Sequence, residues 1–137
     1  DAMFMHGFTY SGHPVACAVA LANIDIIERE QLPANAGEQG AFLLEQLREL
    51  EGHQHVGEVR GKGLMMIVEV VADKETKAKL DPALNAGGKL QAATRERGLI
   101  VRCSNDGIAI APPLTLSRDE ARQIANAIQA AVVDVLG

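Results

Sequence analysis

The fold is decided by Leu64-Met65-Met66-Ile67-Val68-Glu69-Val70-Val71, a stretch that is apolar at every position except Glu69. An apolar run of this length that is rich in valine and isoleucine predicts a strand near the centre of a sheet. Immediately before it, Gly61-Lys62-Gly63 suits a tight turn, and Val56-Gly57-Glu58-Val59-Arg60 predicts a shorter strand. We therefore expect two adjacent strands within residues 56–71.

A second pair of strands is expected further along the chain. The segments Leu99–Ser104 and Ile108–Ala111 are separated by Asn105-Asp106-Gly107, residue types that tolerate positive φ in a tight turn. Pro112-Pro113 ends the second strand, because proline cannot donate to the hydrogen-bond ladder. Between the two pairs, residues 73–82 carry charges of both signs without an apolar period, which indicates a solvated loop.

Helices are expected before, between and after these strands. One should run over residues 14–30, because Pro14 suits a first helical turn. Leucines at helical spacing predict a second helix that ends near Glu51, and a third is expected over 84–98. The capping box Ser117-Arg118-Asp119-Glu120 begins the last helix. Its apolar stripe is Ala121, Ile124, Ala125, Ile128, Val132 and Val135.

The order helix, helix, strand, strand, helix, strand, strand, helix predicts an α+β fold. A small antiparallel or mixed sheet with helices packed on one face would bury the apolar side of each element. The first half of the helix at residues 14–30 is different, because it is apolar nearly all round. Such a helix is expected to leave a larger packed body.

Composition narrows the class of protein. With 137 residues and 47% hydrophobic content, the chain is long enough for a domain with a core. A net charge of -5, one Tyr, three Phe and no Trp leave little with which to bind nucleic acid. The longest apolar run is about half of what a membrane span needs, and no signal-peptide pattern opens the chain. We expect a cytoplasmic protein without a membrane partner, and the start at Asp1 favours a fragment.

The cysteines and histidines predict no metal site. Cys17 and Cys103 lie far apart among apolar neighbours, which favours reduced thiols packed as small hydrophobic side chains. The four histidines fall in two loops without the spacing of metal ligands.

Two stretches carry candidate binding residues. The first is Phe8-Thr9-Tyr10-Ser11-Gly12-His13-Pro14, a polar turn before a helix, where backbone N–H groups and the hydroxyls of Thr9 and Ser11 could hold an anion. The same hydroxyls could instead cap the helix. The second is Arg102, whose planar guanidinium could bind a carboxylate through two hydrogen bonds or pair with a nearby surface acid.

Three segments, in this order, resemble class III aminotransferases of the omega-amino-acid type. His6–Pro14 is similar to the segment by which these enzymes contact pyridoxal phosphate. Val56–Met65 is similar to their V-R-G-x-G-L-M hairpin, in which we expect Arg60 and Glu58 to form a structural pair. Gly98–Leu114 is similar to the signature of their small domain.

The resemblance implies roles for individual residues. Phe8 and Thr9 would help to hold the phosphate of pyridoxal phosphate bound by the other subunit, and Arg102 would bind the substrate carboxylate. Residues 1–30 would end the large domain of a fold-type I enzyme, and residues 31–137 would form its small C-terminal domain. The Schiff-base lysine of this family lies upstream of the matched region. No residue of this chain is therefore expected to be catalytic, and the isolated fragment should be inactive.

The reaction implied is transfer of an amino group from an omega-amino acid or amine to a keto acid such as pyruvate, by a homodimer or tetramer. Aminomutases, racemases and decarboxylases built on the same scaffold stay open as alternatives. So does a non-enzymatic α+β module that binds a partner through the apolar start of its first helix.

Overall fold

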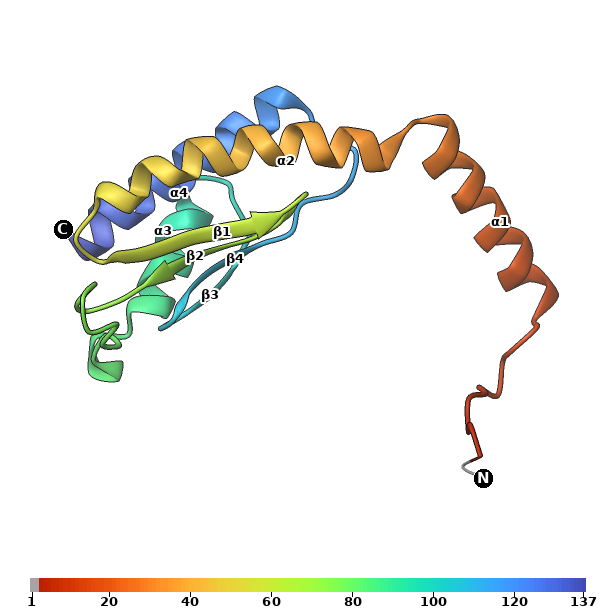
Figure 1. Ribbon diagram of the computed structural model, residues 1–137, viewed down its shortest axis with the longest axis horizontal. Coiled ribbons are helices and arrows are strands. Elements are labelled where there is room, and N and C mark those ends of the chain that lie inside the picture. Colours follow the sequence, from red (N-terminus) through yellow and green to blue (C-terminus); the bar gives the residue numbers. More distant parts are fainter. Residues whose placement is uncertain (1–2) are drawn as a thin grey trace. The chain divides into compact units, whose positions relative to one another are not determined.

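The computed structural model describes residues 3–137 (Figure 1). Residues 1 and 2, which open the predicted segment 1–30, lie outside the described residues. The chain divides into two compact units, Asp1–Leu32 and Pro33–Gly137.

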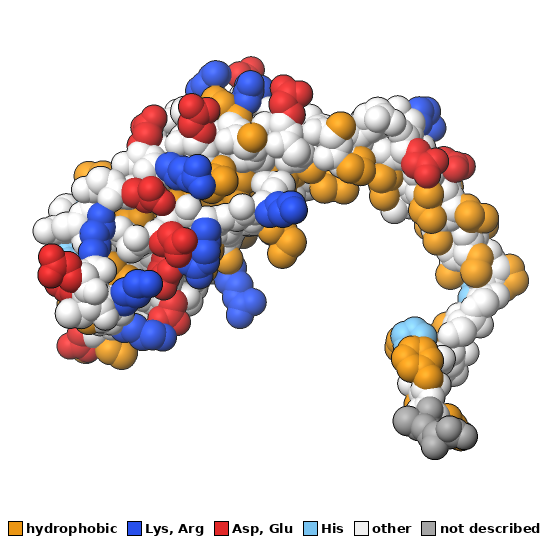
Figure 2. Space-filling model, viewed as in Figure 1, with side chains coloured by type: hydrophobic (Ala, Val, Ile, Leu, Met, Phe, Trp, Pro, Cys, Tyr) orange, Lys and Arg blue, Asp and Glu red, His pale blue; other side chains and the backbone are white. Residues whose placement is uncertain are grey.

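The first unit consists of a loop and helix α1 (Pro14–Arg29), close to the predicted bounds. Pro14 occupies the first turn, as expected, and the side chain of His13 accepts a hydrogen bond there as the N-cap. At the other end, Gln31 has a positive φ of 52°, and its side-chain amide donates to the carbonyl of Glu28 at 2.7 Å. Of the 16 residues of α1, all within the described part of the chain, none is buried. Apolar side chains are visible along this helix in Figure 2.

The second unit is built on a four-stranded antiparallel sheet in the order β1-β2-β4-β3. The strands are β1 (Val56–Lys62), β2 (Met65–Val70), β3 (Arg102–Ser104) and β4 (Gly107–Ile110). Both expected hairpins form, β1 with β2 and β3 with β4. The predicted central position of the apolar stretch is confirmed, because β2 pairs with β1 on one side and β4 on the other.

Three helices cover one face of this sheet (Figure 1), as expected for the predicted α+β fold. They are α2 (Leu32–Arg48), which begins at the last residue of the first unit, α3 (Ala86–Glu96) and α4 (Arg118–Leu136). Two short 3-10 helices, η1 (Glu49–Gly52) and η2 (Pro82–Leu84), precede β1 and α3. The capping box forms as predicted, since Ser117 accepts from the N–H of Glu120 and the Glu120 carboxylate accepts from Ser117.

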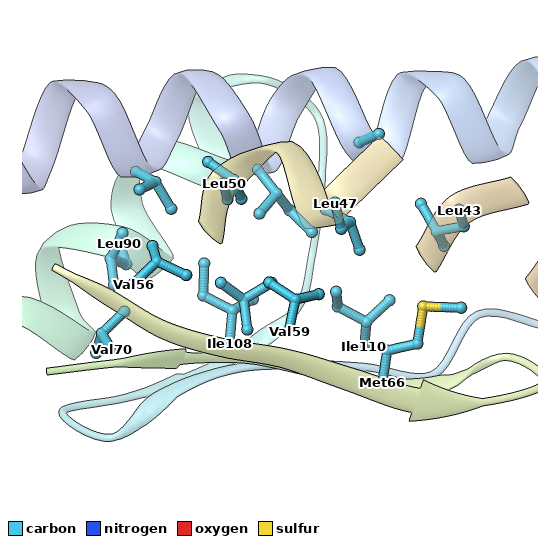
Figure 3. Close-up of a cluster of buried hydrophobic side chains, with 14 of the residues drawn as sticks. Leu43, Leu47, Leu50, Val56, Val59, Met66, Val70, Leu90, Ile108 and Ile110 are labelled. Atoms are coloured by element: carbon cyan, nitrogen blue, oxygen red, sulfur yellow. The ribbon is translucent and has the colours of Figure 1, made fainter. Parts of the chain in front are cut away.

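The hydrophobic core lies between the sheet and these helices (Figure 3). Alternate residues of β2 point into it, so that Met66, Val68 and Val70 are buried. The other side chains of β2 face away, and Met65 is 74% exposed. Side chains that are fully buried include Leu43, Leu47, Val56, Val59, Leu90, Ile108, Ile128 and Val132.

Several predictions from the sequence need correction. Cys17 is exposed instead of packed, whereas Cys103 is half-buried as a small apolar residue would be. Leu80 is buried although its loop was expected to be solvated, because it packs with the core.

Element bounds also differ from expectation. The strand predicted from Leu99 pairs only from Arg102 onward, and the helix predicted from Leu84 begins at Ala86 after a separate 3-10 turn. The first strand runs on through Lys62, so the tight turn is centred on Gly63 and Leu64. Gly63 has a φ of 56°, which favours glycine.

Candidate functional site

The loop before α1 is closed by hydrogen bonds within itself. The N–H of Ser11 donates to the carbonyl of Phe8 at 2.9 Å, and the N–H of Phe8 donates to the Ser11 hydroxyl at 3.0 Å. The Ser11 hydroxyl therefore closes the loop and does not cap α1, which differs from the capping role considered from the sequence. His13 supplies the helix cap, accepting from the N–H of Ala16 through Nδ1 at 3.4 Å.

This arrangement leaves donors free at the tip of the loop. Within residues 3–137, neither the Thr9 hydroxyl nor the N–H groups of Thr9 and Tyr10 have an acceptor. Phe8 is 73% exposed, and its ring lies edge-on to that of His6, with 5.3 Å between ring centroids. A hydroxyl and two N–H groups on the adjacent residues Thr9 and Tyr10 match the chemistry of a phosphate, which accepts several hydrogen bonds.

Arg102 lies in the second unit at the start of the edge strand β3. Its side chain is exposed, while that of the next residue, Cys103, turns toward the helices and is half-buried. No acid in the described part of the chain forms an ion pair with Arg102. The alternative of a surface arginine paired with a nearby acid is therefore not what the described residues form.

A pocket of about 300 Å³ is lined in part by Arg102. Its walls are almost entirely apolar, so a bound anion would be partly shielded from water, where ionic hydrogen bonds are stronger. The residues that line it are Leu99, Ile100, Val101, Arg102, Ala109, Ile110, Ala111, Pro112 and Ile124.

Arg60 lies in the same row across the sheet as Arg102, but unlike Arg102 it forms ion pairs with acids of the described chain. The row is set by pairing, because Arg60 is opposite Ile67 and Arg102 is opposite Ala109, which itself pairs with Ile67. Arg60 Nη1 contacts Glu58 at 3.0 Å and Glu69 at 2.6 Å. The hydrogen bond to Glu69 is the main reason that the pKa of Arg60 is raised. The expected pair of Arg60 with Glu58 forms, and Glu69 completes it.

The other titratable groups do not assemble into a reactive centre. Burial raises the pKa of the Cys103 thiol, against a hydrogen bond with Thr94 that lowers it, so thiolate is disfavoured. His55 contacts the carbonyl of Val71 through Nδ1 at 3.1 Å, and its N–H donates to Nδ1 of His53. Across the described chain, no three His, Cys, Asp or Glu residues are grouped so that they could hold a metal ion.

Between residues 3 and 137, no helix is long and apolar enough to span a membrane.

The residues singled out from the sequence thus fall in two places. Phe8 and Thr9 lie in the first unit, and Arg102 lies in the second beside an apolar pocket. Sequence reasoning missed the pocket, whose walls come from residues 99–102, the end of β4 and α4. It also missed Asn105, whose side chain reaches the start of α3.

The family model of class-III aminotransferases matches residues 2–132 of this chain. Among curated proteins, the chain is 44% identical over 136 residues to an uncharacterized aminotransferase of Sinorhizobium fredii, covering 97% of this chain and 29% of that protein. It is also 44% identical over 130 residues to a diaminobutyrate--2-oxoglutarate transaminase of Halomonas elongata, covering 93% of this chain and 28% of that protein.

Solved structures give the same family. An (S)-enantioselective omega-transaminase from Thermomicrobium roseum is 59% identical with a TM-score of 0.92, and the match covers 100% of this chain and 31% of that one. An amine transaminase from an uncultivated Pseudomonas species, solved with pyridoxal phosphate bound, is 51% identical with a TM-score of 0.89. That match covers 97% of this chain and 30% of the other. The chain therefore spans less than a third of the length of the relatives named here.

Proposed function

Because the chain belongs to the class-III aminotransferase family, we propose that it forms the C-terminal part of a pyridoxal-phosphate-dependent aminotransferase. The complete enzyme would move an amino group from an omega-amino acid or amine to a keto acid such as pyruvate. The observation that carries the proposal is Arg102, a guanidinium without an ion-pair partner among residues 3–137, beside an apolar pocket of about 300 Å³. It lies in the segment that resembles the small-domain signature of the family.

We assign residues 1–30 to the end of the large domain and residues 31–137 to the small domain. The division of the chain after Leu32 supports this assignment, and so does α1, whose apolar residues are not covered within the described chain. In the complete enzyme we propose that α1 packs against the large domain and that two or four copies assemble. The cytoplasmic location expected from the sequence stays a prediction.

The loop at Phe8 and Thr9 fits the cofactor by its donors. The hydroxyl and N–H of Thr9 and the N–H of Tyr10 would hold the phosphate, while the Ser11 hydroxyl keeps the loop in shape through Phe8 N–H. When bound, pyridoxal phosphate supplies the electron sink for chemistry at the amine-bearing carbon. By the family resemblance, Thr9 would serve the cofactor of the neighbouring subunit.

Arg102 would bind and orient the carboxylate of the substrate. Two parallel N–H···O hydrogen bonds fix the plane of a carboxylate, which a point charge does not do. The largely apolar lining of the pocket would reduce competition from water at this contact and strengthen it. This chain therefore supplies binding and orientation, and the groups that make and break bonds lie elsewhere in the complete enzyme.

Substitution of Arg102 tests the proposal. In the complete enzyme, Arg102→Ala should raise KM for carboxylate-bearing substrates by about 10- to 100-fold, because a charge-assisted hydrogen-bond pair is lost. An amine that lacks a carboxylate should be affected by less than about twofold. Arg102→Lys, which keeps the charge but not the planar pair of donors, should fall between wild type and alanine. Equal losses on both substrate classes would remove the carboxylate role.

Substitution of Thr9 tests the cofactor loop separately. Thr9→Val keeps the shape of the side chain without its hydroxyl, so the complete enzyme should lose pyridoxal phosphate faster on dialysis, and Thr9→Ser should retain it. Release at the wild-type rate from Thr9→Val would contradict the assignment.

The non-enzymatic alternative also has a specific observation in its favour, the exposed apolar residues of α1 such as Val15, Val19 and Leu21. Size-exclusion chromatography of this chain separates the two. A binding module should be a stable monomer until its partner is added, whereas the truncated aminotransferase should self-associate. Borohydride treatment with pyridoxal phosphate should trap no stoichiometric cofactor on any lysine of this chain.

A further inference from the structure

We propose that Asn105 is a positioning residue for Arg102: its side chain anchors the β3–β4 turn to the start of α3 and thereby fixes the short strand that carries the arginine. The proposal rests on the carboxylate role of Arg102 proposed above. Asn105 would touch neither substrate nor cofactor, and it would act through the backbone of β3.

The strand β3 needs an anchor of this kind. It has only three residues, Arg102–Ser104, and it lies at the edge of the sheet, paired with β4 alone (Figure 1). The preceding residues 99–101 join no strand within residues 3–137. A three-residue edge strand is weakly held by its ladder, so other contacts must define where its side chains point.

Asn105 supplies one such contact from the turn that follows β3. Its Oδ1 accepts a hydrogen bond from the N–H of Gly87 at 3.1 Å, in a part-buried position. The first N–H groups of a helix have no partner within the helix and need an acceptor. The local N-cap residue, Asn85, provides no side-chain hydrogen bond. A residue 18 positions away in the sequence therefore caps α3.

Gly87 makes the close approach possible. A Cβ added at this residue would lie 2.5 Å from the carbonyl carbon of Ser104, a distance that real Cβ atoms essentially never show. The helix backbone thus lies directly against the end of β3, without a side chain between them. The close approach accounts for glycine at position 87, whereas a Cβ at Gly88 would meet the side chain of Asn85 instead.

A second contact holds β3 against the same helix. The half-buried side chain of Cys103 packs against the hydrophobic core on the helix side of β3, and β3 lies in direct contact with α3. In the turn itself, the Ser104 hydroxyl accepts from the N–H of Asp106 at 3.2 Å. Arg102 directly precedes these anchored residues on the exposed side of the strand. Its position is therefore set by α3 as well as by the sheet.

Asp106 offers a matched control in the same turn. Its carboxylate contacts Lys79 Nζ at 2.8 Å, but the two side chains are 60% and 79% exposed. Exposed ion pairs of this kind contribute little. Loss of the Asp106 side chain should therefore leave β3 in place, although it neighbours Asn105.

The experiment compares Asn105→Ala, Asn105→Asp and Asp106→Ala with Arg102→Ala in the complete, cofactor-loaded enzyme. We expect Asn105→Ala to raise KM for a carboxylate-bearing substrate by about threefold to tenfold, the size of a lost helix cap. Its kcat, and its KM for an amine without a carboxylate, should stay near wild type. Asn105→Asp keeps an oxygen acceptor and should restore binding, while Asp106→Ala should match wild type. Amide hydrogen exchange at residues 102–104 should be faster in Asn105→Ala alone.

The outcomes separate the two proposals. If Arg102→Ala shows no preference between the substrate classes, the carboxylate role fails and the positioning role fails with it. If Arg102→Ala is selective but Asn105→Ala harms both classes equally, or neither, only the positioning role is overturned. If Asn105→Ala does not fold, Asn105→Leu, which has a similar shape but no hydrogen-bond acceptor, takes its place with the same expected selectivity.

Discussion

Helices α1 and α4 are similar in composition but opposite in environment. Both are rich in alanine, valine and isoleucine, and both begin with a side-chain cap. Helix α4 places most of its apolar residues on one face and buries six of them, although Val133 is exposed, whereas α1 buries none within the described chain. The difference lies in how the apolar residues are arranged around the helix. A single stripe can be covered by one sheet, but the all-round apolar surface at the start of α1 requires a larger partner.

The comparison can be measured most directly with one substitution made in both helices. Ile128 in α4 is fully buried, whereas Ile24 in α1 is 49% exposed. Ile128→Ala should reduce the free energy of unfolding of this chain by about 2–5 kcal/mol, because it leaves a cavity in the core. Ile24→Ala should change it by less than about 0.5 kcal/mol. Urea titration followed by circular dichroism would compare them. Equal losses would mean that α1 is packed within this chain.

A second test uses helix α2, which has a packed and an open face. A Cβ at Gly40 would lie 2.1 Å from the carbonyl oxygen of Gly63, whereas nothing lies within 4 Å of one at Gly37. Gly40→Ala should destabilise the chain by about 1–3 kcal/mol through overpacking. Gly37→Ala should stabilise it by about 0.5–1 kcal/mol, since alanine favours a helix. The same sign for both variants in thermal unfolding would contradict the close approach of α2 to the β1–β2 turn.

Removing the N-terminal cap of each helix should distinguish α4 from α1 by a smaller change in the free energy of unfolding. Ser117→Ala removes the capping box of α4 and should reduce the free energy of unfolding by about 1 kcal/mol. His13→Ala removes the cap of α1, whose hydrogen bond is longer at 3.4 Å, and should have a smaller effect on the same urea transition. A larger effect from His13→Ala would overturn the view that α1 adds little stability here.

The smallest expected effect concerns pH. Burial lowers the pKa of His53 from its ordinary value of 6.5, with further contributions from His55 and Lys74. In the folded chain, His53 Nδ1 accepts from the N–H of His55 and its Nε2 is buried without a partner among the described residues. Folding therefore favours the neutral ring. Stability should be complete above pH 6.5 and should decline below it, until the lowered folded-state pKa is passed.

A substitution isolates this effect. His53→Asn keeps an acceptor for the N–H of His55 but does not titrate, so unfolding midpoints should depend less on pH below 6.5 than in wild type. An unchanged pH dependence in the variant would assign the acid response to other groups.

Much of the fold could be predicted because it depends on local patterns. The capping box at Ser117, the turn at Asn105–Gly107 and the apolar run at residues 64–71 each act over a few residues, and each is present in the structure. The candidate site was predictable only in part. Arg102 was found through the family resemblance, but the pocket beside it is made by side chains from β4 and α4 as well.

The remainder depends on contacts between distant segments, which a local pattern does not contain. The exposure of Cys17 and the burial of Leu80 were mispredicted because their immediate neighbours suggested the opposite. The contact of Asn105 with Gly87 joins a hairpin turn to a helix that precedes it in the chain.

The order of helices and strands and the central place of residues 64–71 could be read from the amino-acid sequence, since periodicity, turn residues and caps act locally. The family could be read from it as well, through three matching segments. The covered face of β2 became known only from the three-dimensional arrangement, as did the ion pairs of Arg60 with Glu58 and Glu69. The same arrangement places Arg102 at an apolar pocket without an ion pair among residues 3–137. The physical reason is that burial and charge pairing depend on distances through space. Two arginines on one sheet can therefore differ, one held in ion pairs and the other without an ion pair among residues 3–137.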